Sequence, residues 1–129
     1  MRRSTQERAD SPTAVADTEV ADVHQAMAGL PAQAHGFADV LRAPSGSVSV
    51  TVARWPSGST DDQTPHAEDE VYHVTAGEAT LTVADRAFPI RPGSIAFVAA
   101  GVEHRFTDIR SDLEVVVFWS PARVRDSGS

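Results

Sequence analysis

The sequence predicts an all-β, antiparallel fold, either a sandwich or a barrel, for most of the chain. Val48, Val50 and Val52 alternate with small polar residues, which is the period-two pattern of a strand with one buried face. Short strand-like segments then recur along the chain, separated by turn pairs such as Pro92-Gly93. Many short strands joined by frequent turns are typical of all-β domains.

The expected elements can be placed in order. Residues 1–20 are polar and charged with little periodicity, which indicates a flexible N-terminal arm or an arm that adds a strand to a partner subunit. At 129 residues, we expect one domain over residues 21–125. It begins with a short helix from Val23 to Leu30, ended by Gly29 and Pro31. After the valine strand, further strands are expected at residues 70–76, 79–84, 94–98, 104–107 and 113–119.

Composition excludes several classes of chemistry. The chain has no cysteine and its 11 basic residues are all arginines, so thiolate nucleophiles, disulfides, iron–sulfur clusters and lysine Schiff bases are unavailable. A net charge of -7 disfavours nucleic acid as a partner, because contacts with phosphates need basic patches. Metal or acid–base chemistry remains.

The N-terminus carries Arg2-Arg3, a pair found in some export signals. Acidic residues follow at Glu7, Asp10 and Asp17, and no apolar stretch of useful length accompanies them. No segment approaches the roughly 18 apolar residues that a helix needs to cross a bilayer. We therefore expect a cytoplasmic protein with no membrane partner.

Two segments carry histidine and carboxylate side chains among glycines at regular spacings. The first, residues 58–77, holds Gly58, Thr64, His66, Glu70 and Gly77. The second, residues 93–108, holds Gly93, Ala99, Gly101, His104 and Asp108. These spacings resemble the two signature motifs of the cupin family, G(X)5HXH(X)3E(X)6G and G(X)5PXG(X)2H(X)3N. The resemblance covers roughly residues 46–120.

The resemblance to cupins implies a jelly-roll β-barrel that holds a divalent metal ion. Carried over to this sequence, the motifs give His66, Glu70 and His104 as metal ligands. Thr64 stands where the family has its first histidine, and this is the one departure that touches the ligand set. Two histidines and one carboxylate leave open coordination positions, which favours Fe(II) over a closed structural zinc site. Zinc, manganese and nickel remain open.

Strand alternation places Glu70 and Tyr72 on the same face of one strand. If this is the face that points to the interior, the buried Glu70 carboxylate needs a partner, which a metal ion supplies. Tyr72 is a candidate catalytic residue that can donate a hydrogen bond or a proton near the metal, or it packs in the core. The side chains expected to line the interior are Phe97, Phe106 and Trp119.

Three further residues are candidates for contact with a metal or a substrate. Thr64 can hydrogen-bond a metal-bound water or a substrate, or simply pack. Gln63 is the alternative fourth ligand, provided that a bulge near Pro65 turns it inward. Arg54 lies at the end of the valine face, where it can clamp a substrate carboxylate as a catalytic residue or remain a solvated strand-end arginine.

We expect a metal-dependent enzyme that acts on a small organic molecule in the barrel. Non-haem Fe(II) dioxygenase chemistry is the first choice, because a metal with open positions can bind dioxygen beside a substrate. An isomerase, cyclase, lyase or other rearrangement enzyme, with zinc among the metals, is the alternative. A non-enzymatic small-ligand-binding cupin and a structural accessory subunit are the other classes. A homodimer is expected because a single barrel has edge strands that need covering.

Overall fold

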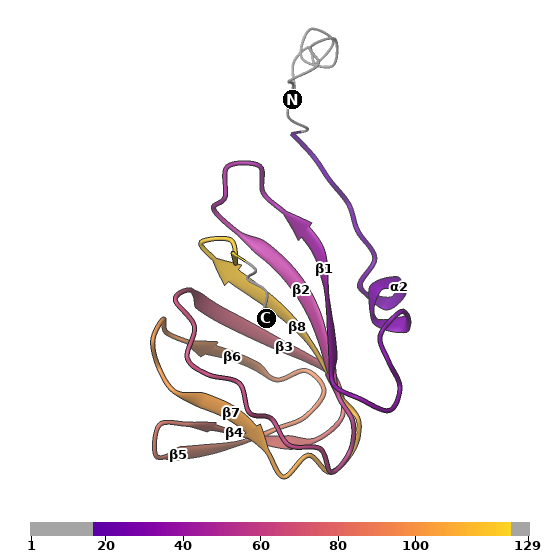
Figure 1. The fold of residues 1–129 in the computed structure, drawn as a ribbon, viewed down its shortest axis with the longest axis vertical. Coiled ribbons are helices and arrows are strands. Elements are labelled where there is room, and N and C mark those ends of the chain that lie inside the picture. Colours follow the sequence, from indigo (N-terminus) through magenta and orange to yellow (C-terminus); the bar gives the residue numbers. More distant parts are fainter. Residues whose placement is uncertain (1–16, 125–129) are drawn as a thin grey trace, which may run out of the picture.

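The computed structural model describes residues 17–124, which form two antiparallel sheets and one short helix (Figure 1). Helix α2 spans Val23–Ala28. The strands are β1 (Gly36–Arg42), β2 (Ser49–Trp55), β3 (Asp69–Ala76), β4 (Ala79–Val83), β5 (Arg86–Ile90), β6 (Ile95–Val98), β7 (His104–Thr107) and β8 (Leu113–Ser120). The all-β prediction is confirmed. Residues 1–16 of the expected arm, and residue 125, lie outside the described range.

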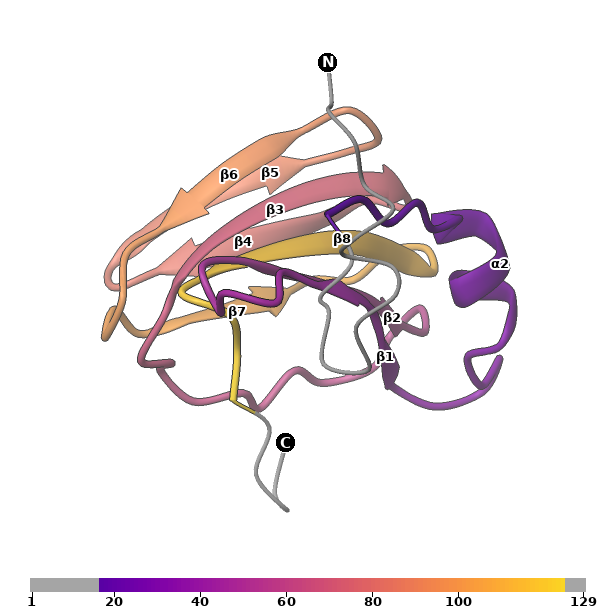
Figure 2. The ribbon, with the colours of Figure 1, turned by 90° about the horizontal axis from the view of Figure 1, so that it is seen from above.

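Strand order shows how the chain folds back on itself. One sheet has five strands in the order β1-β2-β8-β3-β6, and the other has three in the order β5-β4-β7 (Figures 1 and 2). The paired strands are antiparallel. The strands described thus form two separate hydrogen-bonded sheets, and this two-sheet arrangement is the part of the predicted jelly-roll barrel that the structure shows. No helix within residues 17–124 is long and apolar enough to cross a bilayer.

The predicted strands agree with the structure to within two residues, but β1 and β5 were missed. Both are edge strands of their sheets. β1 contains a register shift between Asp39 and Leu41, which interrupts its alternation. β5 contains Pro89, and its first four residues are exposed, so it has neither the composition nor the burial of an inner strand.

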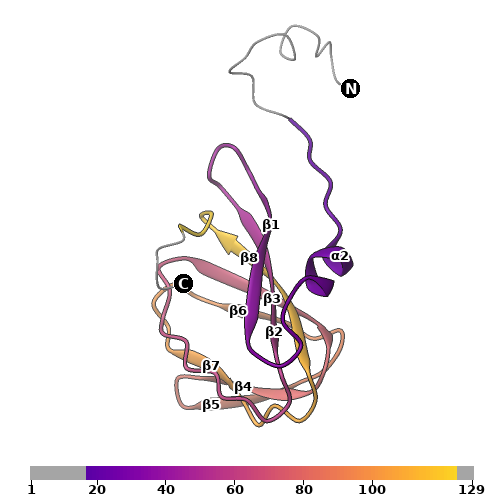
Figure 3. The same ribbon diagram turned by 45° about the vertical axis from the view of Figure 1, so that its right-hand side comes forward.

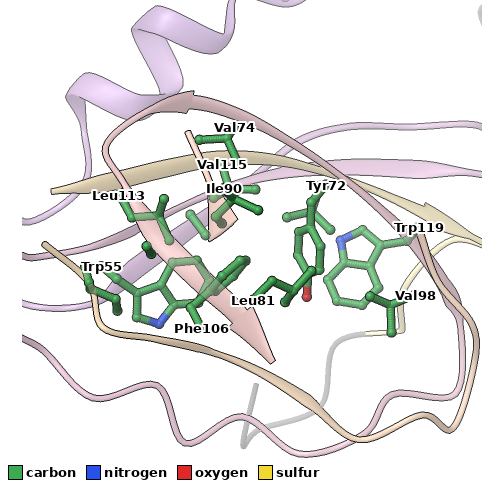
Figure 4. Packing of buried hydrophobic residues seen from close by; sticks show 14 residues of the cluster. Trp55, Tyr72, Val74, Leu81, Ile90, Val98, Phe106, Leu113, Val115 and Trp119 are labelled. Carbon is green, nitrogen blue, oxygen red and sulfur yellow. The ribbon is translucent and has the colours of Figure 1, made fainter. Parts of the chain in front are cut away.

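The main apolar core lies between the two sheets. Its aromatic members include Trp55, Tyr72, Phe106 and Trp119, which Figure 4 shows together with the smaller aliphatic side chains around them. Trp55 and Phe106 pack against each other with ring centroids 4.8 Å apart, and Phe106 in turn meets Tyr72 at 5.1 Å. The aromatic contacts therefore extend from the Trp55 end of the core to the tyrosine that reaches the candidate site.

A second cluster lies on the outer side of the five-stranded sheet and corrects one expectation. Helix α2 lies beside β1 and β2 there (Figure 3). Its Met27 packs against Val50, Val52 and Val116. Val50 and Val52 are buried as expected, but they face the helix and not the space between the sheets, and Val48 precedes the strand and is only partly buried. The inward positions of β2 are held by residues such as Trp55, because successive side chains of a strand point to opposite faces.

Helix α2 is fixed at both ends by polar side chains. At its start, the Asp22 carboxylate accepts hydrogen bonds from the backbone N–H groups of His24 and Gln25 at 2.8 and 3.2 Å. At its end, the Arg54 guanidinium donates to the carbonyl oxygens of Met27 and Leu30 at 3.2 and 3.1 Å. Arg54 therefore holds the helix against the sheet.

Candidate metal centre

Three different parts of the chain bring the predicted ligands together. Glu70 lies on the inward face of β3, where alternation also buries Tyr72 and Val74. His104 begins β7 in the opposite sheet, and His66 lies in the irregular segment before β3. The two motifs are also joined through the backbone, because the N–H of Gly101 donates to the carbonyl of His66 at 2.7 Å.

The donor atoms of these three residues converge. His104 Nε2 lies 3.2 Å from Glu70 Oε2, and His66 Nε2 lies 3.9 Å from the same oxygen. One ligand atom from each residue falls within 4.8 Å of the others. Bonds of about 2.1 Å to a common ion place neighbouring ligand atoms roughly 3.0 to 3.4 Å apart. The 3.2 Å spacing lies in that range, the 3.9 Å spacing lies slightly above it, and the 4.8 Å limit of the set exceeds it. The three residues therefore form a candidate site that would contract around a divalent metal ion.

The hydrogen bonds of His104 prepare one ring nitrogen for a ligand role. Its Nδ1 lies 2.9 Å from the carbonyl oxygen of Val102. A carbonyl can only accept, so Nδ1 carries the proton, and in the neutral ring Nε2 keeps its lone pair. Nε2 is the atom that faces Glu70. Metal-binding histidines commonly donate their other ring N–H to a carbonyl in this way.

Glu70 presents a buried oxygen that lacks a partner among the described residues. Its side chain is 1% exposed, and Oε1 accepts no hydrogen bond. A buried, unpaired carboxylate oxygen costs free energy that a positive ion offsets. This oxygen is the observation that most directly favours a cation at the centre.

In the metal-free protein, the surroundings shift the pKa values of His66 and His104 in opposite directions. Burial lowers the pKa of His66 below 6.5, although the nearby charge of Glu70 acts against this shift. Burial would also lower the pKa of His104, but the hydrogen bonds to Glu70 and to the Val102 carbonyl outweigh it and raise that pKa. His66 is therefore neutral at physiological pH. At His104, protons compete more strongly with the metal ion for the ring nitrogen.

Tyr72 lies at the centre, as its strand position predicted. Its hydroxyl oxygen is 2.9 Å from His104 Nε2, and the residue is 2% exposed. Burial raises the pKa of Tyr72 well above 10, and the neighbouring charge of Glu70 raises it further. The hydroxyl therefore stays protonated at neutral pH and can donate a hydrogen bond or a proton at the site.

The family of this chain follows from a match to a protein-family model. The model described as a cupin domain matches residues 51–121, which is more than half of the chain and contains the three candidate ligands. This chain belongs to the cupin family. The sequence resemblance is thereby confirmed.

The chain is also similar to a curated protein and to several solved structures. The uncharacterized protein SCO3923 of Streptomyces coelicolor is 44% identical over 75 residues, covering 58% of this chain and 71% of that protein. TT1209 from Thermus thermophilus matches with a TM-score of 0.67 and 19% identity, over 82% of this cupin and all of the other chain. A chain from the crystal structures of the DMSP lyases RdDddP and RnDddQII matches with a TM-score of 0.59 and 27% identity, over 74% of this cupin. This cupin covers only 50% of that lyase chain.

Of the two residues predicted as additional contacts, Gln63 faces the centre of this cupin and Thr64 does not. Residues 59–66 form no strand, so Thr64 does not share a strand face with His66, and its side chain is exposed. Gln63, in contrast, lies at the centre, with its Oε1 3.2 Å from His66 Nε2. The expected strand bulge near Pro65 is absent because this segment is irregular, yet the inward orientation of Gln63 agrees with its proposed contact.

Arg54 lies away from the centre, on the helix side of the five-stranded sheet. Its Nε and Nη2 donate to Glu114 Oε2 at 3.0 and 2.8 Å, and Nη1 and Nη2 also donate to carbonyls near the end of α2. The expectation that the valine face leads to the site misplaced this residue, because that face packs on the helix. We therefore leave Arg54 out of the proposed reaction.

Sequence reasoning missed three charged residues near the cupin centre. Asp61 is 3% exposed and accepts a hydrogen bond from the backbone N–H of Phe106 at 2.8 Å. Arg123 pairs with the buried Glu68 at 3.2 Å, and its guanidinium lies 4.7 Å from the ring centroid of Trp119. Arg123 follows the last strand, outside both motifs, so no motif spacing signalled it. Asp61 lies inside the first motif at a position that the motif leaves free.

Proposed function

We propose that this cupin is a metal-dependent enzyme of the lyase or isomerase type, in which Tyr72 donates a proton to a small substrate at the metal centre. The observation that carries the proposal is the Tyr72 hydroxyl, buried and 2.9 Å from a nitrogen of the candidate ligand His104. A proton donor next to a Lewis acid serves bond cleavage and isomerisation without any redox step.

The charges at the centre favour an anionic substrate. A divalent ion held by the single carboxylate Glu70 keeps one net positive charge, since His66 and His104 bind metals in their neutral form. In a buried site, such a charge is best neutralised by an anion from the substrate. We therefore propose a small carboxylate as the substrate class.

Each residue of the centre has a role in this proposal. The metal ion, when bound, supplies a Lewis acid that polarises a substrate oxygen. His66, Glu70 and His104 hold the ion, and the Val102 carbonyl keeps the proton of His104 on Nδ1. Tyr72 holds its proton at the hydroxyl oxygen and transfers it to the leaving oxygen of the substrate as the bond to that oxygen breaks, and the resulting phenolate takes up the proton that the substrate loses from carbon, so that the phenol is regenerated. Tyr72 and Glu70 are 2% and 1% exposed, so water has little access to the reacting groups.

The likeness to the DMSP lyase chain is in agreement with lyase chemistry. It covers about half of that chain, so the activity and the substrate of those lyases come to this cupin only as a hypothesis. DMSP is accordingly included among the substrates to test, although its sulfur leaves as neutral dimethyl sulfide and takes no proton from Tyr72.

Fe(II) dioxygenase chemistry is the second candidate function. The candidate set of two histidines and one carboxylate supports it, because this set is typical of non-haem Fe(II) oxygenases and leaves positions for dioxygen and substrate. Tyr72 is then a hydrogen-bond donor beside the metal.

Metal exchange separates the two candidates. Zn(II) has no redox chemistry, so a lyase or isomerase can act with zinc in the absence of oxygen, whereas a dioxygenase cannot. We would load the protein anaerobically with Zn(II) or Fe(II) and follow DMSP and a panel of small hydroxy and oxo acids by NMR in D2O. Oxygen uptake would be measured in parallel with the Fe(II) protein in air.

Turnover of a carboxylate by the anaerobic Zn(II) or Fe(II) protein, with the activity lost in Tyr72→Phe, is the expected result. Substrate-dependent oxygen uptake by the Fe(II) protein, with no anaerobic turnover, would replace the proposal with the dioxygenase alternative. Binding of a carboxylate to the metal-loaded protein without turnover under either condition would indicate a small-ligand-binding cupin instead.

A further inference from the structure

The segment before β3 contains a second candidate ligand that the family pattern does not indicate. Cupin motifs place a histidine at position 64, but here Thr64 is exposed. The neighbouring Gln63 is turned toward the centre, where its amide oxygen meets His66 Nε2 at 3.2 Å. This spacing equals that between the donor atoms of His104 and Glu70, also 3.2 Å.

Asp61 fixes the orientation of the Gln63 side chain. Asp61 Oδ1 accepts the backbone N–H of Gln63 at 3.1 Å, and Oδ2 accepts from the Gln63 side-chain nitrogen. Asp61 Oδ2 is itself held by the backbone N–H of Phe106, which lies in β7 two residues after His104. The Asp61 carboxylate is therefore anchored to the strand that carries a metal ligand.

The chemistry of these contacts determines which amide atom of Gln63 faces the centre. An ionised carboxylate can only accept hydrogen bonds, so Asp61 must face the NH2 group of the amide. The carbonyl oxygen Oε1 is consequently left on the side of His66, as the 3.2 Å contact shows.

We propose that Gln63 Oε1 is the fourth protein ligand of the metal centre, and that Asp61 is the residue that positions it. The proposal rests on the metal centre of the proposed function and deepens it. Two imidazole nitrogens, one carboxylate oxygen and one amide oxygen then bind the ion, which suits six-coordinate ions such as Fe(II) and Mn(II) that accept oxygen ligands. Two positions of an octahedral shell remain for the substrate.

The exposed Thr64 provides a matched control for this proposal. If the irregular segment mattered only through its packing, removal of either neighbouring polar group would have similar effects. If Gln63 is a ligand, only its replacement should change the affinity for the metal ion and the coordination of that ion. The expected roles therefore differ between two adjacent residues of the same segment.

The test compares Gln63→Leu, Asp61→Asn and Thr64→Val with the wild-type protein. Affinity for Co(II) would be measured by competition with a chelator, and the coordination of bound Co(II) by its visible absorption, which depends on ligand number. Neither readout requires turnover. Melting temperatures of the metal-free proteins would establish that each variant is folded.

We expect Gln63→Leu to weaken Co(II) binding by about tenfold or more and to change the absorption spectrum, given losses of about 10- to 100-fold even for residues that only support ligands. Asp61→Asn should weaken binding less, because its amide no longer enforces one orientation of Gln63. Thr64→Val should change neither quantity. If Gln63→Leu fails to fold, Gln63→Asn, whose amide is one methylene shorter, should show the same loss.

A folded Gln63 variant with wild-type affinity and spectrum would overturn the ligand assignment. An equal effect of Thr64→Val would overturn it too, because the segment as a whole would then be responsible. Failure of the proposed function is distinguishable from both results. If the Gln63 variants lose metal while no carboxylate is turned over, the ligand assignment stands and the proposed reaction is wrong.

Discussion

Tyr72 and His104 come from opposite sheets and meet through a contact of 2.9 Å between the tyrosine hydroxyl oxygen and the histidine Nε2. Tyr72 lies in β3 and His104 begins β7. The contact therefore links the two halves of the fold at the point where the candidate ligands converge. It also means that the phenol is placed by the same packing that places the metal ligand.

Replacement of Tyr72 by phenylalanine should separate metal binding from catalysis. The ring fills the same space in the core, while the hydroxyl beside His104 is removed. We expect metal affinity within about threefold of wild type and a loss of activity of about 100-fold or more, which is the usual contribution of a positioned acid or base. Chelator competition and turnover measure the two quantities. Full activity in a folded Tyr72→Phe protein would exclude the phenol as the proton donor.

Removal of any one of His66, Glu70 and His104 should release the metal. We expect each alanine variant to bind at least about tenfold less metal, as measured by elemental analysis after dialysis. Glu103→Ala serves as the control, because this carboxylate is next to His104 in sequence but its side chain is 72% exposed. Should all three variants retain wild-type metal content, the ion is bound elsewhere.

Metal affinity should fall with pH in two stages. His104 has a raised pKa in the metal-free protein, so a proton must leave its Nε2 when the ion binds, and competition begins as pH falls through that pKa, above 6.5. His66 has a lowered pKa, so its proton competes only below 6.5. The dependence of log Kd on pH should therefore approach one proton per metal first and two at lower pH. Chelator competition between about pH 8.5 and 5 measures the slope, and a flat profile would count against histidine ligation.

The motif residues show why so much of the site could be predicted from the sequence. His66, Glu70 and His104 were assigned from the resemblance to the two cupin motifs, because the chain places them in different segments that only the fold brings together. Tyr72 followed from strand alternation, which places it on the same face of β3 as Glu70. This last relation is local along the chain, so it is visible in the sequence.

The features that were missed depend on contacts between distant segments. The valines of β2 were expected to face the interior, but only the position of α2 reveals that they lie on the outer side. The misplacement of Arg54 followed from this error. Arg123, which follows the last strand, contacts Glu68 and Trp119. Asp61 accepts a hydrogen bond from the backbone N–H of Phe106, which is far away in the sequence. No periodicity encodes such long-range partners.

Arg54 should contribute to stability and not to the metal centre. Its guanidinium joins Glu114 to the carbonyls at the end of α2, with its side chain 14% exposed. We expect Arg54→Met to lower the free energy of unfolding by about 2 kcal/mol, equivalent to roughly 5 to 10 °C in melting temperature, by loss of these hydrogen bonds. Metal content should be unchanged. A wild-type melting temperature combined with weaker substrate binding would restore the role of Arg54 as a substrate clamp.

The uncovered half of the outer sheet face leads to the prediction of a homodimer. Register aligns Val50, Phe118, Val71 and Phe97 in one row across β2, β8, β3 and β6. Helix α2 covers the Val50 end of this row. At the other end Phe97 is 64% exposed, although the sequence had suggested an interior position, and Phe118 is 41% exposed. Apolar patches of this kind commonly mark protein interfaces.

In a dimer with a two-fold axis, each copy can cover this face of the other, because an apolar sheet surface is complementary to itself. We expect light scattering at micromolar concentration to give the mass of a dimer, and Phe97→Glu to shift it to a monomer, since dimerisation would bury the new charge. Phe88→Glu is the control, because Phe88 is 37% exposed on the other sheet. A wild-type monomer would refute the dimer, and a dimer that persists in Phe97→Glu would place the interface elsewhere.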